Sequence, residues 1–291
     1  MFALGLSLLL SACATDVRVP GYQVQDATVR SARLGKDVPY WIALPEGIST
    51  GDPLPVVFFL HGRTNSRHMF RDLGGEGVLL RHRAAGGRPI AVVGLSGAVN
   101  GRDTYWVDGV STRIPWATIV LTELIPQIEA RHNVGRHSSN RVLAGISMGS
   151  HGAFQLAIKS RGMFDCVAGH SLVVRSFETI SREFPGLFGN RSQYAQRDPL
   201  TRLSRYRHMS EVPFKHAWID IGGADEPYFV ARAKLVEAQL RRLGFDEARG
   251  DNLDVGKERP QGDHSYQYWT ERMPAYVAWY DRCLGAVQGS G

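Results

Sequence analysis

Residues 141–158, RVLAGISMGSHGAFQLAI, decide how this chain folds. The first part is a continuous apolar run that ends at Ile146, which is typical of a strand buried on both faces. The run leads into Gly145-Ile-Ser147-Met-Gly149, a pattern in which a strained turn between strand and helix lifts a serine hydroxyl out of the sheet. A side chain at either glycine would crowd that turn. The residues that follow have the composition of a helix with small residues facing a sheet. The stretch therefore predicts a strand, a nucleophilic Ser147 and a helix, in that order.

A serine hydroxyl becomes a useful nucleophile only when a histidine takes its proton and a carboxylate fixes the tautomer of that imidazole. In hydrolases with the G-x-S-x-G turn, the chain order is serine, acid, histidine. After Ser147, His264 lies in a turn-rich loop between the last predicted strand and an aromatic helix over 266–284. The other histidines fall on the helix after the nucleophile, on or beside predicted strands, or in a long inserted segment: His151, His170, His216 and His208. We therefore predict that His264 is the general base.

The acid is expected just past the strand predicted over 216–221. The glycine-rich loop IGGADEP, residues 221–227, brings Asp225 to that position, and we predict Asp225 as the acid. Asp220, inside the strand itself, is the alternative acid or else a buried structural carboxylate. Glu226 ranks behind both, and Asp263 is expected to stabilise its own loop.

Acyl transfer also needs two backbone N–H donors that hold the negative oxygen of the tetrahedral intermediate. One is the N–H of the residue after the nucleophile, Met148. The second must come from another strand end, and LHGRT, residues 60–64, follows the first buried strand. Gly62 lets the backbone turn there, so we predict that the N–H of Arg63 is the second donor.

The long loop over 97–113 contains Tyr105 and Trp106, which are candidates for lining the acyl or alcohol pocket. Loop aromatics also serve as anchors in a protein core, and this alternative stays open for both residues.

Strand and helix patterns alternate along the rest of the chain. Apolar runs of the buried-strand type recur at 55–60, 90–95, 166–169 and 216–221. Residues 22–30 and 39–44 alternate apolar and polar side chains, as antiparallel strands do. The clearest helical spacing runs from Ile114 to His132. This order predicts an α/β fold in which a mostly parallel, twisted sheet carries helices on both faces.

Length and composition favour one large enzyme-like domain. The chain has 291 residues, 43% of them hydrophobic, and we predict a single domain over 22–285. Residues 171–213 separate two predicted strands by a long segment of mixed polarity, so we expect a cap-like insertion there. The net charge of +6 is scattered along the chain, which argues against nucleic-acid binding. No cysteine–histidine cluster has metal-ligand spacing, and we expect neither a metal nor an organic cofactor.

The N-terminus carries a short apolar run over 2–12, too short for a membrane span of about 20 residues. It ends in Leu10-Ser-Ala-Cys13, which resembles the lipobox of bacterial lipoproteins, although no Lys or Arg precedes Cys13. We predict a signal peptide over 1–12, a lipidated Cys13 and a tether over 13–21. The protein is then expected to be exported and held at the membrane of the cell envelope. A merely apolar N-terminus is the alternative.

The remaining cysteines are Cys166 and Cys283. We expect two buried free thiols, because cysteine is often buried for its own sake. A disulfide is the alternative, since an exported protein meets an oxidising compartment.

Several motifs together resemble the esterase D family of α/β-hydrolases, which includes S-formylglutathione hydrolases, feruloyl esterases and mycolyltransferases. The motifs are FLHG at 59–62, ELIPQIE at 123–129, GISMG at 145–149, DIGGAD at 220–225 and GDHSYQYW at 262–269. The resemblance implies an α/β-hydrolase fold with the triad Ser147, Asp225 and His264. Two features depart from the family: Arg63 stands where a small or apolar residue is common, and formylglutathione hydrolases lack a lipoprotein-like start.

The residues and the resemblance lead to the same expected activity, a serine carboxylic-ester hydrolase that works through an acyl-enzyme. The expected substrate is a small-molecule or polysaccharide-linked ester. An acyltransferase with the same triad is the first alternative, and a non-catalytic, surface-binding lipoprotein is the second.

Overall fold

The computed structural model describes residues 17–19, 21–48 and 51–288, with only the backbone described at 17–19 and 286–288. The predicted signal peptide, Cys13 and most of the tether lie outside the described residues. Within the described part of the chain, no helix is both long and apolar enough to cross a membrane.

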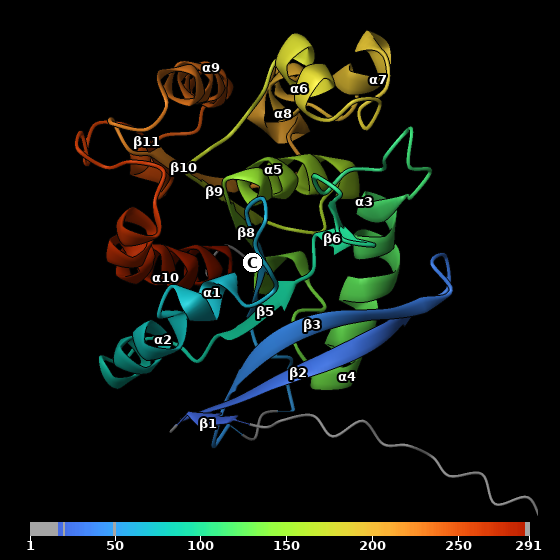
Figure 1. Ribbon diagram of the computed structural model, residues 1–291. Coiled ribbons are helices and arrows are strands. Elements are labelled where there is room, and N and C mark those ends of the chain that lie inside the picture. Colours follow the sequence, from blue (N-terminus) through green and yellow to red (C-terminus); the bar gives the residue numbers. More distant parts are fainter. Residues whose placement is uncertain (1–16, 20, 49–50, 289–291) are drawn as a thin grey trace, which may run out of the picture.

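The centre of the fold is a nine-stranded sheet in the order β1-β2-β3-β5-β4-β8-β9-β10-β11 (Figure 1). Strands β1, β2, β3 and β5 pair antiparallel, and all pairings from β5 to β11 are parallel. The strands are β1 (Val17–Val19), β2 (Tyr22–Ser31), β3 (Lys36–Pro45), β4 (Val56–Leu60), β5 (Ala91–Leu95), β6 (Ala98–Val99), β7 (Arg102–Asp103), β8 (Arg141–Ile146), β9 (Cys166–His170), β10 (His216–Ile221) and β11 (Asn252–Val255). The short β6 and β7 form a separate hairpin.

Helices cover both faces of this sheet. The helices are α1 (Met69–Asp72), α2 (Gly75–Ala84), α3 (Trp116–Ile119), α4 (Ile125–His132), α5 (Met148–Ser160), α6 (Phe177–Glu183), α7 (Arg191–Ala195), α8 (Pro199–Leu203), α9 (Pro227–Leu243) and α10 (Tyr266–Gln288). Helices α3, α4, α5 and α9 share one apolar core, and α1, α2 and α10 share the other. The predicted mostly parallel sheet with helices on both faces is confirmed.

The central strands have continuous apolar runs because each of their two faces is buried in a core. In β4, Val56, Phe58 and Leu60 pack into one core, whereas Val57 and Phe59 pack into the other. Side chains alternate across a strand, so a strand covered on both faces must be apolar at every position. The short edge strand β11 lacks such a run, which explains why sequence pattern did not reveal it.

The helix predicted from Ile114 to His132 is interrupted. Between α3 and α4, residues Val120–Leu124 form a wider π-helical turn. This turn ends two residues before Pro126, whose ring nitrogen has no N–H to donate to the preceding turn. The apolar face of the whole segment still packs on the sheet.

The expectation of two free thiols was wrong. Cys166 on β9 and Cys283 on α10 form a disulfide, with their Cα atoms 6.2 Å apart. The bond arises because α10 packs back across the sheet and brings together residues separated by 117 positions. That packing is not visible in local sequence.

The segment predicted as a cap-like insertion contains three short α-helices, α6, α7 and α8, which lie together above α5 in the view of Figure 1. Each begins at a side chain that caps its first turn, namely Ser176, Asn190 and Asp198. Phe188 and Tyr194 anchor the insertion in the core that also contains α5.

Candidate active site

Ser147 occupies the sharp turn between β8 and α5 with a positive φ of 56°. The flanking glycines are required by close backbone approach. A Cβ on Gly145 would lie 2.3 Å from the carbonyl oxygen of Gly149, and one on Gly149 would lie 2.0 Å from that of Leu60. The turn therefore has no room for other residues, and it presents the Ser147 hydroxyl above the carboxyl ends of the strands.

His264 and Asp225 complete a hydrogen-bonded chain that begins at Ser147. Nε2 of His264 lies 2.9 Å from Oγ of Ser147, and Nδ1 lies 2.8 Å from Oδ2 of Asp225. With Nδ1 donating to the carboxylate, Nε2 is left to accept the serine proton. The other oxygen of Asp225 accepts the N–H of Glu226 at 2.6 Å. The structure thus brings together the three residues predicted as a triad.

Asp220 takes part in a different network. Its Oδ1 pairs with Nδ1 of His170 at 2.8 Å, and its Oδ2 accepts the hydroxyls of Tyr268 and Tyr276 at 3.0 and 2.9 Å. Nε2 of His170 in turn lies 2.8 Å from the hydroxyl of Tyr280. Burial lowers the pKa of His170 and raises the pKa of all three tyrosines, so these groups remain neutral hydrogen-bond partners. The network ties α10 to the sheet and leaves Asp220 unable to serve His264.

His151, on the nucleophile helix, is buried between Tyr105 and Phe188. Burial, and next the positive charge of Arg175, lowers its pKa to about 3. A ring that stays neutral and points into the core has no access to Ser147.

His61 has a positioning role that sequence reasoning missed. Its Nδ1 donates to the carbonyl oxygen of Gly62 at 2.7 Å, and its Nε2 accepts the N–H of Gly97 at 2.8 Å. Burial lowers its pKa, which keeps the ring in this neutral form. The ring therefore braces the turn after β4 against the loop after β5. The sequence signal for this role is the histidine of the motif FLHG at 59–62.

Both residues predicted as oxyanion donors reach the pocket beside Ser147, which has a volume of about 340 Å³. Met148 is the first residue of α5, so its N–H belongs to the helix start, where backbone donors have no intrahelical partner. Arg63 follows Gly62 in the turn after β4. Its half-exposed side chain extends to Glu183 at 3.9 Å and lies over the ring of Phe184.

Tyr105 and Trp106 have different surroundings in the structure, although both adopt positive φ angles. Tyr105 lines the pocket, and burial raises its pKa to about 12. Trp106 is instead fully buried and donates its indole N–H to the carbonyl oxygen of His61 at 3.3 Å. It packs so tightly that a Cβ on Gly97 or Gly152 would lie 2.5 Å from its ring. The prediction that Trp106 lines the pocket is therefore corrected, because the residue anchors its loop in the core.

The pocket wall also contains residues to which the sequence patterns gave no role: Arg175, Phe229, Tyr266 and Trp269. Arg175 comes from the start of the insertion and donates to the hydroxyl of Tyr105. Its guanidinium lies 2.9 Å from Glu183 and 4.9 Å from the centre of the Phe229 ring. Among the described residues, no group of three or more His, Cys, Asp or Glu side chains is placed to hold a metal ion.

Comparison with known proteins gives a family match over most of the chain. The family model described as "Esterase: Putative esterase" matches residues 31–280. Esterase Rv1288 of Mycobacterium tuberculosis (strain ATCC 25618 / H37Rv) is 30% identical over 134 residues, which is 45% of this chain and 28% of that protein. Esterase MT1326 of Mycobacterium tuberculosis (strain CDC 1551 / Oshkosh) matches to the same extent. The match to these curated relatives thus spans about 28% of their length.

Solved structures match the fold at low sequence identity. A ferulic acid esterase has a TM-score of 0.74 at 19% identity, with 91% of this chain and 99% of that chain covered. An S-formylglutathione hydrolase from Agrobacterium tumefaciens has a TM-score of 0.72 at 20% identity, with 93% and 99% covered. MPT51 of Mycobacterium tuberculosis has a TM-score of 0.67 at 16% identity, with 95% and 100% covered. These likenesses show the α/β-hydrolase fold.

Proposed function

The chain belongs to the Esterase family, and from this premise we propose that it is a serine carboxylic-ester hydrolase that works through an acyl-enzyme on Ser147. The observation that carries the proposal is the continuous hydrogen-bonded chain from Ser147 through His264 to Asp225 at the wall of an open pocket. Family membership alone supports ester chemistry. The geometry supports the residues that perform it.

In the first half-reaction, Ser147 Oγ attacks the ester carbonyl carbon while Nε2 of His264 takes the hydroxyl proton. The carbonyl oxygen becomes an oxyanion held by the backbone N–H groups of Met148 and Arg63. When the tetrahedral intermediate collapses, the bond to the alcohol oxygen breaks and His264 returns its proton to the leaving alcohol. The acyl group is then bound to Ser147 as an ester.

In the second half-reaction, His264 takes a proton from water, whose oxygen attacks the acyl carbon. Collapse of this intermediate releases a carboxylic acid and returns the proton to Ser147 Oγ. Asp225 stays ionised throughout, holds the tautomer of His264 and stabilises its protonated form. The buried position of its carboxylate strengthens that interaction.

The pocket walls support an ester whose acyl group is apolar or aromatic. Tyr105, Phe229 and Trp269 line the pocket together with Ser147, whereas the charge of Arg175 is offset by the carboxylate of Glu183, 2.9 Å away. The ferulic acid esterase with the same fold gives an aromatic acid as a specific candidate for the panel.

A panel of chromogenic esters tests the proposal, with acyl groups from acetyl to dodecanoyl and with feruloyl and cinnamoyl esters. We expect turnover by the wild type and none by Ser147→Ala. Repeating the assay with an acceptor alcohol and analysing the products separates hydrolysis from acyl transfer. If no ester is turned over faster than by Ser147→Ala, the proposed activity is wrong.

A further inference from the structure

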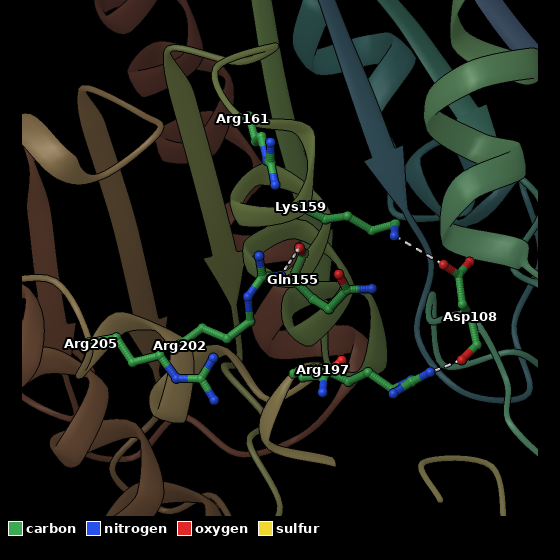
Figure 2. Close-up of a pocket in the computed structure, with 8 residues that line it drawn as sticks. Asp108, Gln155, Lys159, Arg161, Arg197, Arg202 and Arg205 are labelled. Carbon is green, nitrogen blue, oxygen red and sulfur yellow. Dashed lines mark hydrogen bonds and ion pairs between the residues drawn. The ribbon is translucent and has the colours of Figure 1, made fainter. Parts of the chain in front are cut away.

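A second pocket, of about 350 Å³, lies at the end of α5 opposite to Ser147 (Figure 2). Its charged lining consists of five cations and one carboxylate: Lys159, Arg161, Arg197, Arg202, Arg205 and Asp108. A helix of 13 residues is about 20 Å long, so an ester bound at Ser147 does not extend into this pocket as a small molecule. The pocket therefore needs an explanation of its own.

The positive charges in the pocket exceed what the protein neutralises. Asp108 pairs with Nζ of Lys159 at 3.0 Å, and its charge also acts on Arg197, whose Nε donates to the backbone carbonyl of Asp108 at 2.8 Å (Figure 2). Among the described residues, no hydrogen bond or ion pair engages the Arg161 side chain. Burial lowers the pKa of Arg202, Tyr206 raises it, and the nearby charges of Arg205 and Arg161 lower it. In the part of the chain that the structure describes, Arg161, Arg202 and Arg205 therefore have no carboxylate partner.

Backbone carbonyls hold the guanidinium groups in place without neutralising them. Arg202 donates to the carbonyl of Gln155 at 3.2 Å, and Arg197 donates Nη1 to that of Gln193 at 2.7 Å. Arg205 donates to the carbonyl of Ala195 at 3.2 Å. Each guanidinium has five N–H donors, so most of them remain available. A preorganised set of donors costs little conformational entropy when a ligand binds.

The negative end of the α5 dipole accounts for part of this arrangement, because it favours cations near the helix C-terminus. Lys159 and Arg161 fit that explanation. Arg197, Arg202 and Arg205 do not, since they come from the insertion, which folds back onto α5 and directs them into the same space (Figure 2). Three further cations from a separate segment indicate a ligand.

We propose that this pocket binds a phosphorylated group with two or more negative charges. A carboxylate supplies one charge, whereas a phosphate monoester carries about −1.5 to −2 at neutral pH. The planar fork of arginine matches phosphate oxygens in a bidentate manner. The group belongs either to a free phosphorylated molecule or to the headgroup of a phospholipid. The proposal is independent of the ester hydrolysis proposed above.

Titration calorimetry of the full chain with inorganic pyrophosphate tests the site. We expect saturable binding at one site, weakened by about tenfold or more in Arg161→Gln/Arg202→Gln, because two charge-assisted contacts are lost. Arg30→Gln/Arg33→Gln removes the same charge from exposed positions at the far edge of the sheet and should bind as the wild type does. Arg161→Gln alone, at an exposed position, should still weaken binding even if the double variant fails to fold.

The site is overturned if pyrophosphate gives no saturable heat at millimolar concentration, or if both double variants lose the same affinity. Malonate, a dianion without phosphorus, is the matched probe, and equal affinity for malonate contradicts the phosphate assignment. Sedimentation with phosphatidic acid–phosphatidylcholine vesicles identifies the source. If the wild type binds the vesicles and Arg161→Gln/Arg202→Gln does not, the ligand is a lipid headgroup. If the wild type binds pyrophosphate but not the vesicles, the ligand is a free phosphorylated molecule. Vesicle binding without pyrophosphate binding contradicts the proposal.

Discussion

The carbonyl oxygen of His170 accepts the backbone N–H of Ser147 over 3.0 Å, so the last residue of β9 holds the nucleophile turn in place. The ring of the same His170 is fixed by Asp220 and Tyr280. The buried polar network behind the sheet thus supports the nucleophile without touching the reacting atoms. Two carboxylates five positions apart therefore have separable roles, Asp225 in the triad and Asp220 in this network.

Asp225→Asn should lower kcat by about 10⁴-fold with little change in folding, because the amide favours the wrong tautomer of His264. Asp220→Asn should instead lower stability by about 1 to 3 kcal/mol, because it disturbs buried partners on β9 and α10. Steady-state kinetics and chemical denaturation of both variants measure the difference. A larger loss of kcat in folded Asp220→Asn than in Asp225→Asn would show that the acid is misassigned.

Ser147→Ala and His264→Ala should each abolish turnover, and the double variant should be no worse than either. Triad members act as a unit, so the losses do not add. Active-site titration and single-turnover kinetics measure the effect, and circular dichroism checks that folding is unchanged. Additive losses contradict the assignment, as does wild-type activity in Ser147→Ala.

Two substitutions of Arg63 distinguish a role of its backbone N–H from a role of its side chain. Arg63→Ala keeps the N–H and loses the long contact to Glu183 and the packing over Phe184, so kcat for a small neutral ester should stay near that of the wild type. Arg63→Pro removes the donor, and losing one oxyanion contact costs about 10²- to 10³-fold in kcat. Thermal melting must first show that Arg63→Pro folds, because proline can distort the turn. If alanine is as damaging as proline, the guanidinium itself contributes, and another N–H must serve the oxyanion.

The disulfide between Cys166 and Cys283 should contribute strongly to stability, because it closes a loop of more than 100 residues in the unfolded chain. Loop-closure entropy for that length corresponds to about 4 to 5 kcal/mol. Guanidinium denaturation of Cys166→Ala/Cys283→Ala and of the wild type with and without reductant measures this contribution. The double variant should not respond to reductant. Equal stability of the oxidised and reduced wild type contradicts the bond.

Because the ring of His151 is buried in its neutral form, we expect the protein to lose stability in acid. Its folded pKa of about 3 lies below the ordinary 6.5, so the unfolded chain binds the proton more readily. The stability from the neutral ring is complete above about pH 6.5 and decreases as the pH falls toward 3, by about 2 to 3 kcal/mol at pH ~4.5. In His151→Leu, the free energy of unfolding should fall less steeply over this range, as measured by denaturation at several pH values. The exposed His208→Leu is the control, and an unchanged slope in His151→Leu rules out this contribution.

Local sequence pattern predicts the features that depend on neighbouring residues. The sharp turn that presents Ser147 leaves room only for glycine at 145 and 149, and continuous apolar runs identify strands covered on both faces. Ser147 and Asp225 follow two of those strands, and the carboxyl ends of parallel strands lie at the same edge of a sheet, so the pattern predicts that these two residues are close together.

Tertiary structure alone decided which carboxylate faces His264, where Trp106 lies, that Cys166 and Cys283 are joined, and that five cations share one pocket. The choice between Asp220 and Asp225 depends on α10, whose packing brings Tyr268 and Tyr276 onto Asp220. The cationic pocket depends on the insertion folding back onto α5. Such contacts join residues tens to more than a hundred positions apart, and they are set by how helices pack on the sheet, which no local pattern of residues encodes.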